Sequence, residues 1–77
     1  MNAADIERIL DLGRSAAEAG NWAEARRYFA QALGIGPRNE EALLWQAGLA
    51  DDPRESIAHL QQVLKINPGN KRAQAGL

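Results

Sequence analysis

The sequence predicts an all-α protein built from antiparallel helical hairpins. Apolar residues recur at spacings of three and four along most of the chain, as they do on one face of a helix. Short clusters of Gly, Pro, Asn and Asp interrupt this pattern at intervals of a typical helix length. Alanine is abundant, whereas there is one Val and no Thr, a usage that favours helices over strands. With 77 residues, the chain is expected to form a single domain.

The first helix is expected between Asn2 and Gly20. Asn2 is a suitable N-cap, and Asp5 places a carboxylate near the free N–H groups of the first turn. Apolar residues follow at helical spacing from Ile6 and Ile9 onward, and Gly20 ends the run.

The second helix is expected to begin at Asn21, which together with Glu24 resembles a capping box. Phe29 belongs to its apolar face, and Trp22 is expected to pack over the preceding turn. The Gly-Ile-Gly-Pro segment at 34–37 should end this helix.

The third and fourth helices have the clearest start signals. Asn39 should cap the third helix, whose apolar stripe lies within residues 42–50. Asp52, Pro53 and Glu55 supply a cap, a proline in the first turn and an acidic residue at the capping-box position of the fourth. Both helices therefore have predicted N-termini.

One pattern of helix-ending residues occurs twice in the chain. The sequence Ala-Leu-x-Ile-x-Pro-x-Asn at residues 32–39 is matched by Val-Leu-x-Ile-x-Pro-x-Asn at residues 63–70. The second copy should end the fourth helix, and residues 71–77 should begin a fifth. Repetition of this kind indicates a stack of similar helical units.

This pattern resembles the tetratricopeptide repeat, a helix–turn–helix unit of about 34 residues. The residues that carry the resemblance in the first half are Leu12, Gly13, Gly20, Ala25, Phe29, Ala32 and Pro37. The resemblance implies a short right-handed α-solenoid in one domain spanning residues 1–77. Its expected parts are repeat one at about 6–39, a shortened repeat two at about 40–70, and a partial helix at 71–77.

The chain departs from the family pattern in two respects. Ile9 and Ala16 stand where the family usually has aromatic residues. The second unit, which runs from Pro37 to Pro68, is shorter than the usual repeat by nearly one helical turn. The shortening predicts a third helix that is about one turn shorter than its counterpart.

Small residues should set the distance between paired helices. Gly13 and Ala47 leave room for the partner helix to approach, and Ala25 faces the first of these positions. Phe29 and Leu60 should fill the grooves beside them.

The chemistry-bearing residues do not form a catalytic or metal-binding pattern. His59 is expected on a solvated helix face, and Ser15 and Ser56 are expected at helix crossings. The acidic pairs at 40–41 and 51–52 lie at helix starts, where capping and the helix dipole account for them. The sequence therefore predicts no enzyme, no metal site and no cofactor.

Composition also restricts the partners. A net charge of −1 gives no electrostatic reason to expect nucleic acid or an anionic membrane. No segment has the run of about 20 apolar residues that spans a bilayer, and the N-terminus does not resemble a secretion signal. Together with the lack of cysteine, this predicts a cytoplasmic protein.

The resemblance implies that the chain binds a peptide or helix of another protein on a concave surface, which the first helix of each hairpin lines. The positions of this surface are Glu7, Leu10, Arg14, Glu18, Glu41, Leu44, Trp45 and Gly48. An apolar centre with the positive charge of Arg14 would suit a short apolar segment that carries an acidic residue.

Two features of this surface qualify the expectation. The Lys and Asn pair with which family members clamp a C-terminal carboxylate is not matched, because Leu10 and Arg14 stand there. Trp45 lies off the stripe formed by Leu43 and Ala47, so it either packs between repeats or contacts a ligand.

Two alternatives to a peptide-binding scaffold remain open. The chain could be a structural homo-oligomerisation module, or a fragment of a larger repeat protein. Two and a half repeats are expected to leave apolar residues open at both ends, around Ile6 and Ile9 and around Ile57, Leu60 and Leu64. A homodimer would cover these surfaces.

Overall fold

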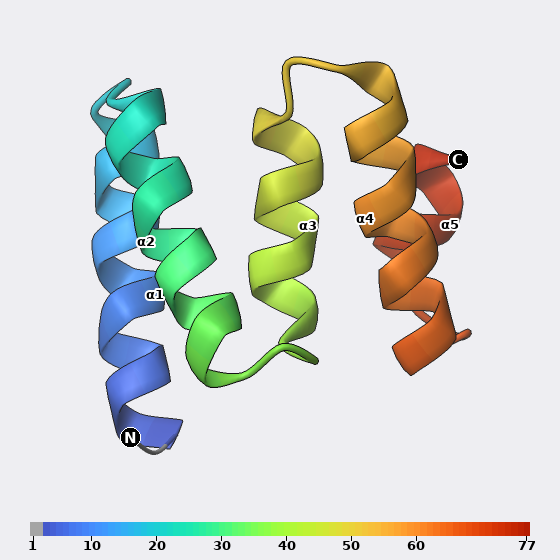
Figure 1. The fold of residues 1–77 in the computed structure, drawn as a ribbon, viewed down its shortest axis with the longest axis horizontal. Coiled ribbons are helices and arrows are strands. Elements are labelled where there is room, and N and C mark those ends of the chain that lie inside the picture. Colours follow the sequence, from blue (N-terminus) through green and yellow to red (C-terminus); the bar gives the residue numbers. More distant parts are fainter. Residues whose placement is uncertain (1–2) are drawn as a thin grey trace.

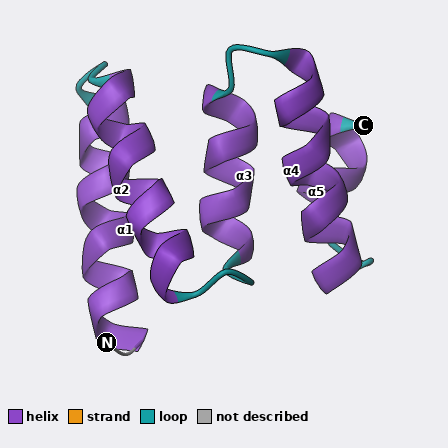
Figure 2. Ribbon diagram, viewed as in Figure 1, coloured by secondary structure: helices purple, strands orange, loops and turns teal. Residues whose placement is uncertain are grey.

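The computed structural model describes residues 3–77 and shows five helices in that part of the chain (Figure 1). No strand occurs among these residues, so the predicted all-α fold is confirmed (Figure 2). The helices are α1 (Ala3–Glu18), α2 (Trp22–Ile35), α3 (Glu40–Leu49), α4 (Pro53–Ile66) and α5 (Lys71–Gly76).

Each helix packs against the next one along the chain. Helix α1 lies on α2, α2 on α3, α3 on α4 and α4 on α5, so the hairpins form a short stack (Figure 1). The helical repeat solenoid that the sequence predicts is therefore present. Helix α3 has 10 residues and α1 has 16, so α3 is the shorter helix, as the shortened second unit predicted.

The turns use the predicted residues with one exception. The side chain of Asn39 accepts a hydrogen bond from the N–H of Ala42 at 2.9 Å, and that of Asp52 accepts from the N–H of Arg54 at 2.8 Å. Both predicted caps are confirmed. The predicted side-chain cap at Asn21 is wrong, because this side chain makes no capping hydrogen bond in the described chain. The proposed cap at Asn2 lies outside the described residues.

Backbone hydrogen bonds explain why Asn21 does not cap. The N–H of Gly20 bonds to the carbonyl of Ala17 at 3.0 Å, and the N–H of Asn21 bonds to that of Ala16 at 2.8 Å. With Gly20 at a φ of +79°, this is a Schellman end of α1. The tight turn leaves Asn21 at a ψ of 72°, whereas the capping Asn39 has a ψ of 109°.

The core lies between the helix layers and is centred on Phe29, which is fully buried. A Cβ atom on Gly13 would lie 2.8 Å from Cζ of the Phe29 ring, so the ring occupies the space that the glycine leaves open. Leu33 packs against both the first group of buried residues and the second, which includes Leu60 and Val63. One continuous apolar layer therefore joins the two hairpins.

Several residues differ from their predicted environment. Trp22 is 54% exposed instead of packed over the turn. Gly34 lies inside α2, which continues to Ile35. The expected open surface around Ile6 and Ile9 is not found, because Ile9 is buried in the first core group and Ile6, partly buried, packs against that group. A single helical period does not show how many neighbours a helix has, so it misplaces residues at the margins of the apolar stripe.

At the other end of the stack, α5 covers part of the surface that was expected to be open. Leu60 is buried, and a Cβ atom on Gly76 would lie 2.7 Å from its Cδ1 atom. Ile57 remains 43% exposed and Leu77 58% exposed. Within residues 3–77, no helix has the length and apolar character that crossing a membrane requires.

Candidate protein-interaction site

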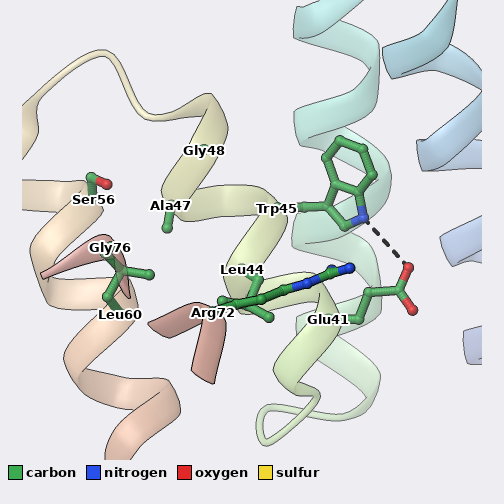
Figure 3. A pocket seen from close by; sticks show the side chains of 9 residues that line it. All are labelled: Glu41, Leu44, Trp45, Ala47, Gly48, Ser56, Leu60, Arg72 and Gly76. Atoms are coloured by element: carbon green, nitrogen blue, oxygen red, sulfur yellow. Dashed lines mark hydrogen bonds between the residues drawn. The ribbon is translucent and has the colours of Figure 1, made fainter. Parts of the chain in front are cut away.

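A pocket of about 410 Å³ opens between α3, α4 and α5 (Figure 3). Helix α3 forms one wall and α5 part of the opposite rim, with α4 contributing between them. The lining residues are Glu41, Leu44, Trp45, Ala47, Gly48, Ser56, Leu60, Arg72 and Gly76. The volume lies within the range of about 300–1,000 Å³ that is usual for ligand pockets.

Helix α3 presents four of the predicted site residues to this pocket. Glu41, Leu44, Trp45 and Gly48 follow one another at spacings of three, one and three residues, which places them on one face of the helix. The cap at Asn39 fixes where the helix begins and hence which face it turns to the pocket. The structure brings these four residues together.

Trp45 is held in place by packing between the hairpins. Its ring is stacked on that of Phe29, with ring centroids 5.1 Å apart and an angle of 8° between the planes. Its Nε1–H donates a hydrogen bond to Oε2 of Glu41 at 3.4 Å, as Figure 3 shows. Trp45 therefore packs between the repeats and also lines the pocket.

Glu41 is tied to the first hairpin by an ion pair. Nη1 of Arg14 in α1 donates to Oε2 of Glu41 in α3, and Nη2 of Arg14 donates to Asp11. The hydrogen bonds to Glu41 and Asp11 raise the pKa of the Arg14 guanidinium above its ordinary value. With two carboxylates as partners, Arg14 is not the free positive charge that the sequence led us to expect.

The remaining predicted residues of α1 do not join the pocket. Leu10 is 1% exposed and belongs to the core. The prediction that it lies on the binding surface is therefore wrong. Leu10 belongs to the same core group as Phe29 of α2 and Ala42 of α3, which places it inside. Glu7 and Glu18 are exposed on α1, and neither lines the pocket.

Sequence reasoning missed the part of the pocket formed by α4 and α5. Ser56 and Leu60 were assigned to packing, and Arg72 and Gly76 were given no role in binding. A signal was present, because the match between residues 32–39 and 63–70 places α5 where the next first helix of a hairpin would lie. The guanidinium of Arg72 has no ion pair or hydrogen-bond partner in the described part of the chain.

The structure also places the acidic and histidine side chains that could take part in metal binding. Among residues 3–77, no three His, Asp or Glu side chains are close enough together to hold a metal ion. His59 is half-buried beside a second hollow between α2, α3 and α4, so its predicted solvated position is only partly correct. The side chains that line the candidate site itself supply apolar contact and charge.

The stacked hairpins define a helical repeat protein with an open pocket at its second junction. The family model of the tetratricopeptide repeat matches residues 10–51, more than half of the chain. The chain belongs to the tetratricopeptide repeat family. Members of this family are in general non-catalytic scaffolds for protein interactions. Comparisons with curated proteins and with solved structures gave no match.

Proposed function

We propose that the chain is a non-catalytic scaffold that binds a peptide or helix of a partner protein on the face formed by α1, α3 and α5. The observation that carries the proposal is the pocket between α3 and α5, where Glu41, Leu44, Trp45 and Gly48 meet. Apolar walls with a polar rim are typical of peptide-recognition sites. A cytoplasmic location and the repeat boundaries after residues 39 and 70 remain predictions.

The affinity should be weak. A short peptide seated in a single pocket should bury less than the usual ~800 Å² per partner of a stable interface. We expect dissociation constants in the micromolar range or weaker, because only a few contacts offset the entropy that is lost on association.

A displayed peptide library followed by chemical-shift mapping tests this proposal. Peptides selected on the ¹⁵N-labelled chain should shift the amide signals of α3 and α5 and leave those on the outer face of α2 unchanged. Gly48→Glu should abolish these shifts, because it fills the pocket from an open position without a close neighbour among the described residues. Selected peptides that shift only α2 and α4 would disprove this choice of surface.

A structural homodimer is the second candidate. Ile57 and Leu77 are 43% and 58% exposed on α4 and after α5, so one end of the stack is apolar. The outer side of α1 carries Arg8, which is paired with Asp5 at 2.6 Å. Because the two ends differ, a two-fold contact of the apolar ends is favoured over head-to-tail stacking.

Sedimentation at increasing concentration tests the dimer. A homodimer would have twice the 8.4 kDa mass of the chain, and Leu77→Glu would return it to the monomer. A mass of 8.4 kDa at every concentration would exclude this candidate.

A further inference from the structure

The two junctions between neighbouring hairpins can be compared position by position. Asn39 and Asn70 cap α3 and α5 with nearly the same backbone angles, φ −72° and ψ 109° against φ −70° and ψ 107°. Each accepts a hydrogen bond from the N–H three residues later, at Ala42 and Ala73. The sequence register that places Asn39 on Asn70 therefore matches the start of α3 with that of α5.

The first junction is filled by its own side chains. Trp45 of α3 covers Phe29 of α2, and Arg14 of α1 pairs with Glu41 of α3. The stack and the ion pair close the space between the hairpins with apolar contact and compensated charge.

The second junction has the same positions but lacks the side chains that fill them. In the register set by the two capping asparagines, Phe29 corresponds to Leu60, Trp45 to Gly76 and Glu41 to Arg72. The repeat motif of the first helices, which matches Gly13 with Ala47, aligns Arg14 with Gly48. Where the first junction has the stacked rings, the second has Leu60 packed against Gly76. Where the first has an ion pair, the second has only Arg72, whose guanidinium is unpaired among the described residues.

These replacements account for the pocket. Leu60, Gly76, Arg72 and Gly48 all line it, so the hollow lies where the first junction has its stack and ion pair. Helix α5 contains Lys71 and Arg72 and no acidic residue, which makes this rim positive. Figure 3 shows Arg72 extending from α5 toward the side of the pocket formed by Glu41 and Trp45.

The missing groups indicate the chemistry of the occupant. Leu44 and Trp45, which are half-buried, leave apolar surface open in the pocket, and a large apolar side chain would cover it. The guanidinium of Arg72 offers a planar set of donors that fits a carboxylate. Glu41 repels such a carboxylate little, because it already accepts hydrogen bonds from Arg14 and Trp45.

We propose that the pocket takes one large apolar side chain of a partner peptide, and that Arg72 pairs with the carboxylate of a neighbouring Asp or Glu in that peptide. The proposal rests on the proposed function and names the recognition element of that surface. It assigns to α5 the positive charge that the sequence had placed at Arg14.

Short peptides with blocked termini test the proposal without a contribution from a terminal carboxylate. The probe is Gly-Glu-Phe-Glu-Gly, compared with Gly-Gln-Phe-Gln-Gly and Gly-Glu-Ala-Glu-Gly by titration of the ¹⁵N-labelled chain. The first peptide should bind roughly fivefold more tightly than the second, as about 1 kcal/mol for an exposed ion pair implies. It should also bind more tightly than the third, because alanine leaves the apolar walls uncovered.

Variants of α5 assign the charge effect to one residue. Arg72→Gln should remove the preference for the Glu peptide, and Arg72→Lys should restore part of it. Lys71→Gln is the matched control, since it removes the same charge from an exposed neighbour that does not line the pocket. Raising the ionic strength to about 0.5 M should reduce the preference.

The possible results separate this proposal from the general function. Binding at α3 and α5 that is equal for the Glu and Gln peptides would overturn the role of Arg72 and leave the binding surface intact. An equal loss in Lys71→Gln and Arg72→Gln would show unspecific attraction to α5 and would also overturn it. Chemical-shift changes confined to α2 and α4 would overturn both the role of Arg72 and the binding surface. Changes at the pocket residues that depend only on the concentration of the chain would identify a second copy as the occupant and would overturn the peptide proposal.

Discussion

The ring of Trp45 lies parallel to the ring of Phe29, with centroids 5.1 Å apart, and this contact joins the second hairpin to the first. Phe29 is fully buried in α2, whereas Trp45 is half-buried in α3. The stack therefore forms part of the core and part of the pocket wall. Binding and stability should be coupled at this position.

A double-mutant cycle measures the contribution of this stack. Phe29→Leu and Trp45→Leu should show a coupling energy of about 0.5–1.5 kcal/mol in urea unfolding, beyond the loss of buried area. Phe29→Leu combined with Trp22→Leu is the control and should be additive, because Trp22 is exposed at the far end of α2. Equal coupling in both cycles would argue against a specific stack.

The glycine at the crossing of α1 and α2 should not accept a side chain. Gly13→Ala should cost about 1–3 kcal/mol by overpacking against Phe29, which exceeds the gain of up to about 1 kcal/mol in helix propensity. Gly34→Ala is the matched control, since its Cβ would meet no atom of the described residues within 4 Å. It should stabilise the chain, so the two thermal midpoints should move in opposite directions.

The cap of α4 should contribute measurably to stability. Asp52→Ala removes the acceptor of the 2.8 Å hydrogen bond from the N–H of Arg54 and should cost about 0.5–2 kcal/mol. Asn21→Ala, at a helix start without a side-chain cap in the described chain, should cost less. Thermal unfolding of the two variants tests the difference, and a larger loss for Asn21→Ala would contradict the assigned caps.

Glu40 should make part of the stability depend on pH. Its carboxylate accepts hydrogen bonds from the side-chain amides of Asn70 and Asn67, both at 2.9 Å, and these lower its pKa below the ordinary value of 4.5. A carboxyl with a lowered pKa stabilises the fold above its ordinary pKa, and this contribution is lost as the pH falls through 4.5 and below.

Thermal unfolding as a function of pH isolates this effect. Wild type should be more stable than Glu40→Gln at neutral pH, and the difference should shrink as the solution is acidified below pH 4.5. Glu24→Gln is the control, because Glu24 lies in the first turn of α2 and has no side-chain partner in the described chain. A difference that stays constant at low pH would mean that the carboxylate charge is not involved.

Much of the secondary structure could be predicted because its causes are local. The caps at Asn39 and Asp52 depend on N–H groups within three residues, and the breaks depend on Gly and Pro. The wrong prediction of a cap at Asn21 has a local cause too. The tight end of α1 sets the backbone angles of Asn21, and with these angles its side chain makes no capping hydrogen bond. Residue type alone does not report that constraint.

The helices, most of their boundaries, the repeat pattern and the close contact at Gly13 could be read from the amino-acid sequence, because helical period and turn chemistry are properties of short segments. The stacking of the helices was needed to show that Leu10 is buried, that Arg14 is neutralised by Glu41 and that Arg72 is unpaired among the described residues. Arg14 and Glu41 are 27 residues apart, and which charges meet depends on how the helices stack. Burial and charge compensation depend on which residues are neighbours in space. The spacing of residues within one helix does not reveal those neighbours.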